Sequence, residues 1–447
     1  MELPYSKKRL YLSGIDWLIA TMDRHSRRSS GVGNHSTLIL EFENPISTDA
    51  LRERLAEIAE SLPIISGRAA RDLINLAPYW KTWRNNPPLP LETANATDNA
   101  EFNAILQQTF NRPFASKREH FRFIHIRRGK RGDALLMTFD HKLLDAKGAE
   151  LFLNLLADDY GRDATAETAA AFSKGLDPVL RNWSAQFEAG RTVQRKMIAA
   201  SKEGCFGAAD YAERIGERPG KHPASFHAEF AEFDEKTTAR VSRAAEENAG
   251  FMMETPFLLA VTARALQKTV APNTHMRCFV PVPLDTRSKP PRRGETFFNH
   301  ISFAFFHLDI PPEASIKTIS RDARRQLMET ISDDFPGKME TGTRPLRIFP
   351  LPFLAKAMDM PFNGKICSFA FANVGESAAP ENILGVPLTA LRHMPRTPTP
   401  PSLGVFFNSH RKKLAATLSV DSNAWKNDFA EKMRNSLEEE LEQTLPD

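Results

Sequence analysis

The sequence has few cysteines, and no pattern would use them together. Three occur in 447 residues, Cys205, Cys278 and Cys367, and they lie far apart and are odd in number. They form no CxxC pair and no metal-ligand spacing, so we predict neither a disulfide framework nor a metal site. Free thiols in a reducing compartment are the expectation.

Long apolar runs are also missing. No stretch of about 18 apolar residues occurs, so no transmembrane span is predicted. The opening residues "MELPYSKKRLYLSGIDWLIATMDRH" are basic and then partly apolar, but Gly14, Asp16 and Asp23 interrupt the apolar part. That interruption argues against a signal peptide. We expect a soluble cytoplasmic protein and leave peripheral membrane contact open.

An excess of charge is lacking as well. The formal net charge is only +4, and basic residues do not alternate with aromatic ones, so no nucleic-acid partner is predicted. A mildly basic chain suits an anionic small ligand. Three basic runs (24–28, 127–131 and 287–293) could contact the phosphates of an anionic ligand, although such loops are more often only solvated.

What the chain does have is length and mixed secondary-structure signals. Its 447 residues, 41% of them apolar, exceed one ordinary core and favour two lobes. Strands and helices alternate irregularly, with hairpins as well as crossovers, which favours an α/β fold of the α+β sandwich type over a doubly wound parallel sheet. We divide the chain into an N-terminal lobe (1–175), a linker with a basic amphipathic helix (176–223) and a C-terminal lobe (224–447).

The most informative stretch is "LLMTFDHKLLDAKGAELFLNLLADDY", Leu135 to Tyr160. An apolar strand ends in Asp140-His141, Asp145 follows four residues after the histidine, and a helix with an apolar face comes next. A histidine at the end of a buried strand is held rigidly and still reaches a cleft. Its imidazole can take a proton from an alcohol, thiol or amine near neutral pH. We therefore predict that His141 is a general base.

The HxxxD spacing is weak by itself, and a structural histidine beside a capping aspartate stays open. The sequence contains no GxSxG elbow and no convincing cysteine nucleophile, so the predicted chemistry needs no covalent intermediate. His125 alternates with apolar neighbours in its strand and is interpreted as a packed histidine. The "GVGN" run (31–34) is not a dinucleotide motif and is interpreted as a substrate-proximal loop.

The segment resembles the HHxxxDG signature of the chloramphenicol acetyltransferase-like superfamily. That superfamily includes peptide-synthetase condensation domains, wax ester synthases and alcohol acyltransferases. Three further segments are similar to it over nearly the whole chain: "LYLSGIDWLIATM", "FVPVPLDTRSKPP" leading to "FFNHISF", and "SFAFANVGE". The resemblance implies two chloramphenicol-acetyltransferase-like lobes with mixed sheets and an active site in a tunnel between them. We expect a stand-alone member of bacterial type.

The resemblance also implies roles for particular residues. His141 would be the catalytic base. Asp145 would be structural and pair with Arg287. The candidates for oxyanion or tunnel positions are Ser368, Asn373, Gly375 and Asp140. Two departures from the family pattern are Asp140, in place of the first histidine, and Ala146, in place of the glycine. No DFGWG occurs, which disfavours the plant branch.

The predicted function is an acyltransferase that moves an acyl group from a thioester to a hydroxyl or amine acceptor. Acyl-coenzyme A is the expected donor and a phosphopantetheine thioester on an acyl-carrier protein the second; both are substrates, and no tightly bound cofactor is expected. Two alternatives stay open: a condensation enzyme that depends on a carrier protein, and an inactive binding protein that keeps the fold. The sequence does not determine the acyl chain length, the acceptor or the oligomeric state.

Overall fold

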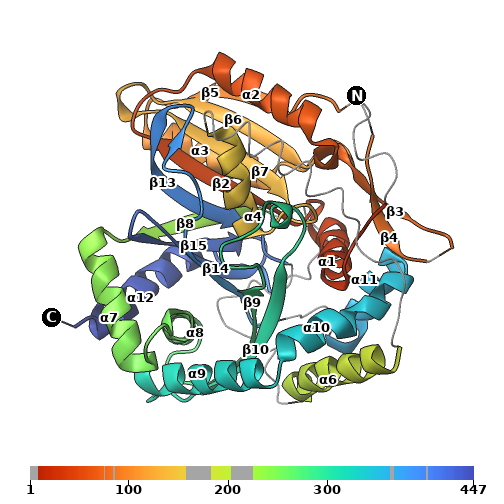
Figure 1. Cartoon of the computed structure of the whole chain (residues 1–447). Helices are drawn as coiled ribbons and strands as arrows, with labels where there is room; N and C mark the ends of the chain where they lie inside the picture. Colours follow the sequence, from red (N-terminus) through yellow and green to blue (C-terminus); the bar gives the residue numbers. More distant parts are fainter. Residues whose placement is uncertain are drawn as a thin grey trace.

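The computed structural model describes residues 9–74, 76–83, 86–157, 183–202, 225–362, 367–398 and 401–446. Two lobes with mixed sheets are visible in Figure 1, which confirms the predicted fold class. The upper lobe contains a six-stranded sheet in the order β12-β13-β2-β7-β6-β5, and the lower lobe a four-stranded sheet in the order β11-β14-β15-β8. Within the described ranges, no helix combines the length and apolar character needed to cross a membrane.

The six-stranded sheet of the first lobe is buried on both faces. Leu38 and Leu40 pack on one side with α2 and α4, while Ile39 packs on the other with α3, because successive side chains of a strand point to opposite faces. All its pairs are antiparallel except β5 with β6. The elements of this lobe are α1 (Gly14–Ser30), β2 (His35–Phe42), α2 (Thr48–Ser61), β5 (Leu91–Asn95), α3 (Asn99–Asn111), β6 (Phe121–Arg127), β7 (Ala134–Asp140) and α4 (Ala146–Leu153).

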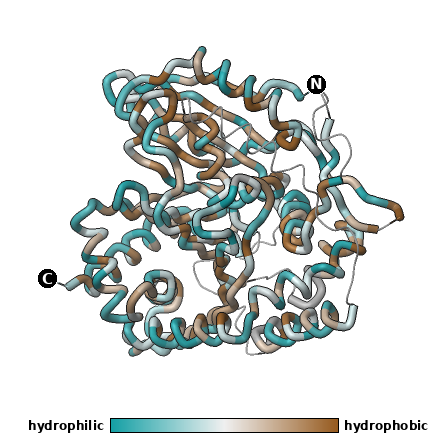
Figure 2. The backbone as a smooth tube through the Cα atoms, viewed as in Figure 1, coloured by the Kyte–Doolittle hydropathy of each residue, from teal (hydrophilic) through white to brown (hydrophobic). Residues whose placement is uncertain are grey.

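A small sheet in the order β1-β4-β3 flanks this lobe near α1. Its strands are β1 (Leu10–Tyr11), β3 (Arg68–Arg71) and β4 (Pro78–Lys81). The turn between β3 and β4 projects from the molecule, and Figure 2 shows apolar residues at its tip.

The second lobe packs helices against one face of its strands. Its core joins apolar side chains of α7, α8, α9 and α12 to those of β9, β10, β11, β14 and β15. Figure 2 shows hydrophilic residues along α7 and α9 at the outside of the lobe, while α8 lies within it. The elements are β8 (Phe226–Glu232), α7 (Glu235–Ala249), α8 (Glu254–Val270), β9 (Met276–Asp285), β10 (Ile301–Ile310), α9 (Ile316–Ser332), α10 (Phe335–Thr343), α11 (Leu351–Phe362), β11 (Ala370–Glu376), β14 (Leu403–His410), β15 (Lys413–Asp421) and α12 (Phe429–Thr444).

One segment crosses between the lobes. Strands β12 (Asn382–Ile383) and β13 (Val386–Pro395) lie within the range predicted as the C-terminal lobe, yet β13 pairs antiparallel with β2 of the first. The division at residue 224 is therefore wrong for these residues. The pairing joins positions about 350 residues apart in sequence, for example Leu391 with Leu40, and no local pattern reports such a partner.

The predicted linker and basic helix (176–223) lie outside the described residues except for α6 (Trp183–Lys202). This helix packs beside α10, with Lys196 over the ring of Phe335 and Val193 in a shared apolar cluster. It is amphipathic, as expected. Tyr160, placed at the end of the predicted helix after His141, also lies outside the described residues.

Candidate active site

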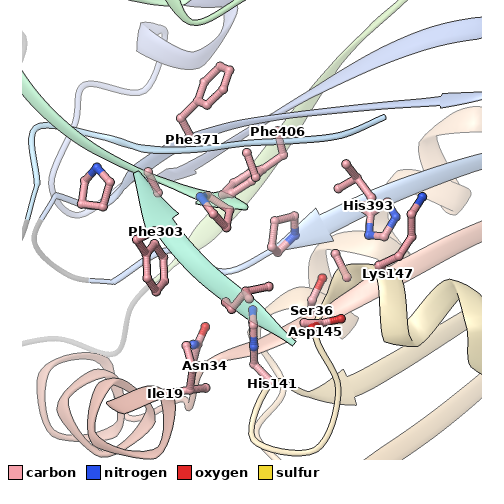
Figure 3. Close-up of a pocket in the computed structure, with 18 of the residues that line it drawn as sticks. Ile19, Asn34, Ser36, His141, Asp145, Lys147, Phe303, Phe371, His393 and Phe406 are labelled. Carbon is pink, nitrogen blue, oxygen red and sulfur yellow. The ribbon is translucent and has the colours of Figure 1, made fainter. Parts of the chain in front are cut away.

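A cavity of about 240 Å³ lies between the lobes, and most of its surface is apolar. Its wall draws on α1, β2, the end of β7 and the start of α4 in the first lobe, and on β9, β10, β11 and β14 in the second. The crossing strand β13 completes it. Figure 3 shows His141 and Asn34 side by side in this wall, with Phe303, Phe371 and Phe406 across from them.

His141 lies in the turn directly after β7, half-buried and at the cavity surface. Its backbone N–H donates to the carbonyl of Asn34 over 3.2 Å, which ties the turn to the start of β2. Its ring nitrogen Nδ1 lies 3.1 Å from Oδ1 of Asn299. Within the described ranges Nε2 has no hydrogen-bond partner, so this nitrogen is available to a substrate.

The side chain of Asn299 determines which tautomer His141 adopts. Its Nδ2 group donates to Oδ1 of Asp16 (3.2 Å) and to the carbonyl of His141 (3.1 Å), and both of these atoms can only accept. Oδ1 of Asn299 must therefore face Nδ1 of His141, which donates its N–H. The lone pair of the neutral imidazole then lies on Nε2, as a general base requires.

Asp16 holds this arrangement from the first turn of α1. One oxygen accepts from both the backbone and the side chain of Asn299, and the other accepts from the backbone and hydroxyl of Ser13 in a capping box. The carboxylate is buried and fully used by donors. Asp16 and Asn299 therefore position His141, although sequence reasoning assigned a role to neither; Asn299 entered only as part of the segment "FFNHISF" that carries the resemblance. The pattern Ser13-x-x-Asp16 could have indicated a helix cap, but not this second contact.

Asp145 and Arg287 are brought together, as the resemblance implies. Nη2 of Arg287 donates to Oδ1 of Asp145 over 2.6 Å, and the side chains of Arg287 and Asp145 are 1% and 3% exposed. Burial by itself would lower the pKa of Arg287, but the carboxylates of Asp145 and Asp285 raise it by more, so the pKa of Arg287 lies above its usual value. Asp145 also caps α4 through Gly148 N–H and accepts from His300 N–H. The Asp145 carboxylate thus accepts hydrogen bonds from Arg287, Gly148 and His300, and it does not contact the imidazole of His141.

Asp140 is a buried structural carboxylate and is not among the residues of the cavity wall. It lies 2.9 Å from Nδ1 of His120 and 2.8 Å from Nζ of Lys142. Burial alone would raise its pKa, but Lys142 and His120 lower it well below the usual range. Lys142 also contacts Asp23, whose other oxygen accepts from Asn34 N–H. This network fixes the loop below His141 and gives Asp140 no role at the cavity surface.

The three candidates near β11 have different positions. Ser368 is fully buried, accepts from Phe279 N–H over 2.9 Å and is not part of the cavity wall. Asn373 is in the wall, but its Nδ2 donates to Thr255 and its Oδ1 accepts from Gly375 N–H. Gly375 has φ +74°, at a bulge in the pairing of β11 with β14. Among these three residues, only Asn373 reaches the cavity.

Asn34 is a cavity residue at the end of the "GVGN" loop. Figure 3 shows its side-chain amide next to the ring of His141, and no described residue hydrogen-bonds to that amide. The loop lies so tightly against α1 that a Cβ on Gly33 would come within 2.3 Å of Asp23 Oδ1, which explains the glycine at this position. The expected substrate-proximal loop thus contributes one polar side chain, and its signal in the sequence was the glycine-asparagine run.

The remaining predicted features lie away from the cavity, apart from Arg287. His125 is packed between Thr48 and Asp133, with ring nitrogens 2.9 and 2.7 Å from their oxygens. Of the three basic runs, only Arg287 is in the cavity wall. Among the described residues, no cluster of histidine, cysteine and acidic side chains is arranged to hold a metal ion.

Comparison with known proteins relates this geometry to solved structures. No family model matches the sequence. No curated protein matches it either. The first condensation domain of the CDA synthetase superposes with a TM-score of 0.62 at 14% identity, covering 98% of this chain and 97% of that one. The trichothecene 15-O-acetyltransferase of Fusarium sporotrichioides superposes with a TM-score of 0.67 at 11% identity, covering 98% and 96%.

The chain has the chloramphenicol acetyltransferase-like fold. An epimerization domain of tyrocidine synthetase B shares it, with a TM-score of 0.60, 13% identity and coverage of 99% and 97%. Near-complete coverage in both directions means that both lobes and their crossing strand are part of the shared architecture. At these identities the likeness establishes the chloramphenicol acetyltransferase-like fold and leaves the chemistry to the residues of the cavity.

Proposed function

We propose that this chain is an acyltransferase that moves an acyl group from a thioester to a hydroxyl or amine, with His141 as general base. The observation that carries the proposal is the state of the imidazole. Nδ1 is engaged by Asn299, and Nε2 carries its lone pair at the surface of an apolar cavity between two lobes. A base so placed typically contributes about 10²–10⁴-fold.

The reaction proceeds by direct transfer. Nε2 of His141 takes the proton of the acceptor as its oxygen or nitrogen attacks the thioester carbonyl. The tetrahedral intermediate collapses by breaking the C–S bond, and the proton on Nε2 passes to the departing sulfur. No group on the protein is acylated, in keeping with Cys367, whose buried thiol has its pKa raised to about 12 and is no nucleophile.

Asn34 is the group we assign to the oxyanion. Its amide lies beside the His141 ring in Figure 3 and has no partner among the described residues. An N–H donor in an apolar site stabilises the charge that develops on the carbonyl oxygen, and removal of one such donor typically costs about 10²–10³-fold in kcat. This assignment replaces Ser368, whose hydroxyl is engaged with Phe279 away from the cavity.

A hydroxyl acceptor is favoured because one protein with this fold is an O-acetyltransferase. Acyl-coenzyme A is the first donor to test. The competing proposal is a condensation enzyme that takes its acyl group from a carrier protein, since condensation domains have this fold. Arg191 and Arg195, which are exposed one turn apart on α6, would suit an acidic carrier.

The deciding experiment measures thiol release from short to long acyl-coenzyme A thioesters, with and without pooled alcohols and amines. We expect release that depends on an acceptor and falls by at least about 10²-fold in His141→Ala. His275→Ala is the matched control, because this exposed histidine pairs only with Asp309 outside the cavity. Release that survives His141→Ala would contradict the assignment of the base.

The same panel separates the alternatives. Activity with carrier-linked thioesters alone, weakened by salt, would favour the condensation enzyme. No transfer from either donor, with retained binding of thioesters, would favour the inactive binding protein. In both cases the folded state of each variant is checked first by circular dichroism.

A further inference from the structure

A second histidine lies in the cavity wall, and the proposed transfer does not use it. His393 of β13 is 3% exposed, and its Nε2 lies 2.9 Å from Oε1 of Glu150. Its other ring nitrogen, Nδ1, is buried without a hydrogen-bond partner among the described residues. Figure 3 shows the ring among the cavity residues, near Lys147 and remote from His141.

The partners of His393 indicate how its ring is protonated. Glu150 is completely buried in α4, and its Oε2 accepts from Lys147 Nζ and from Ala378 N–H, both over 2.9 Å. Lys147 therefore already balances the carboxylate charge. Oε1 of Glu150 can only accept, so Nε2 of His393 is the donor, and a neutral ring leaves its lone pair on Nδ1. His393, a residue of the cavity wall near Lys147 and Ser36, thus carries one buried acceptor that has no partner among the described residues.

The register of the sheet gives the separation of the two histidines. His393 is paired with Leu38, and Leu38 with Met137, four residues before His141. His393 and His141 are therefore separated by two strand spacings across the sheet, roughly 10 Å, and by four residues along the strand direction, roughly 13 Å. Ser36, Phe139 and Pro395 lie on the same face of the sheet between them and also form cavity wall. One extended ligand on this face would reach both histidines.

We infer that His393 is a specificity-determining residue: its Nδ1 accepts a hydrogen bond from an O–H or N–H group at the end of the substrate remote from the reacting centre. The inference rests on the proposed acyl transfer and names its substrate class. That class is an apolar chain with a hydroxyl or amide N–H at its far end. An unpaired buried acceptor costs free energy, so a ligand that supplies the donor is favoured over one that does not.

Chain-matched probes test this inference. Octanol, decanol and dodecanol serve as acceptors with the corresponding α,ω-diols, which carry a remote donor, and with the ω-methoxy alcohols, which carry only a remote acceptor. We expect the wild-type protein to prefer the diol of matching length over its methoxy ether by about tenfold in kcat/KM, beyond the statistical gain from two hydroxyls. The preference should appear mainly in KM, because the contact is distant from the reaction.

Two substitutions separate recognition from support of Glu150. In His393→Leu the preference should be lost. In His393→Gln it should persist, because the amide can donate to Glu150 and still offer an oxygen to the ligand. The control is His227→Phe, since this histidine of β8 bonds to Ser422 outside the cavity. If His393→Leu lowers kcat/KM equally for diol and ether, the residue is only structural and the inference is overturned.

Calorimetry distinguishes failure of this inference from failure of the proposed function. Binding of the same diols and ethers is measured on His141→Ala, which retains His393 but not the base. A diol preference in binding without transfer in the wild type would refute the acyltransferase and uphold His393. Transfer without any diol preference, or a preference for the ether, would overturn the inference about His393 alone. The inference about His393 is also overturned if neither the transfer assay nor calorimetry shows a preference for the diol, and this includes the case in which no probe binds.

Discussion

The ion pair between Asp145 and Arg287 joins the lobes, and its removal gives the sharpest prediction about stability. In Arg287→Met, the chain loses the 2.6 Å bond to Asp145, a 2.9 Å bond to Asp285 and a 3.0 Å bond to the carbonyl of Glu295. The methionine fills a similar volume, so the change is mainly electrostatic. The Asp145 carboxylate stays buried without its cation.

The magnitude follows from what Asp145 retains. Breaking one side of a buried pair costs about 3–5 kcal/mol. Asp145 keeps its two backbone donors, Gly148 and His300, so we expect the lower end, about 3 kcal/mol of unfolding free energy. Asp145→Asn should cost less, because Arg287 keeps Asp285 and the Glu295 carbonyl. The double variant should cost less than the sum of the two, since the members of a contacting pair are coupled.

Urea unfolding measures these values, with tryptophan fluorescence and circular dichroism followed together because two lobes need not unfold in one step. Arg277→Met is the control: Arg277 lies at the other end of β9, and its partner Asp309 is exposed, so the cost should stay below about 0.5 kcal/mol. A cost under about 1 kcal/mol for Arg287→Met, or strictly additive costs in the double variant, would refute the reasoning.

Three further predictions concern single side chains. Asn34→Leu should lower kcat by about 10²–10³-fold with little change in stability, and a loss confined to KM would contradict an oxyanion role. Burial, together with the charge of Arg396, lowers the pKa of His35 to about 3, so between about pH 3 and 6.5 the unfolded chain binds a proton that the folded chain does not. The contribution of His35 to the free energy of unfolding should be complete above about pH 6.5 and smaller by about 2 kcal/mol at about pH 5. In His35→Phe the free energy of unfolding should fall less over the same pH range. In a Cys205→Ser background, neither Cys278 nor Cys367 should react with a disulfide reagent near about pH 8 until the protein unfolds; fast labelling of Cys367 would contradict its burial, which raises the pKa of the thiol to about 12.

The hairpin and the helix around His141 could be predicted because their signals are local. Alternating apolar residues in 121–127 indicate β6, a nearly continuous apolar run in 134–140 indicates β7, and Asp145 begins α4 as its N-cap. The helices over 335–362 and strand β13 were missed. Leu351–Phe362 is apolar and lacks a clear polar face, and β13 depends on a partner strand at the other end of the chain.

The candidate site divides in the same way. The sequence identified His141 from its place after a buried strand, and the resemblance supplied Asp145 and Arg287. Neither supplied the roles of Asn299 and Asp16, which lie 158 and 125 positions from His141. Asn299 contacts His141, and Asp16 contacts Asn299, only when the loop before β10 folds onto the start of α1. Nor could the sequence or the resemblance separate Asn373, in the wall, from Ser368, behind it.

The sequence by itself therefore determined the local elements and the mixed two-lobed fold class, and it yielded His141 as the predicted base. Those features follow from periodicity, capping and intrinsic side-chain chemistry, which act over a few residues. Only the tertiary structure decided the tautomer of His141, the amide beside it and the second histidine at the far end of the cavity. The first two depend on contacts among residues 16, 34, 141 and 299, and the third on the contact of His393 with Glu150. The geometry of such contacts exists only once both lobes and the crossing strand have packed together.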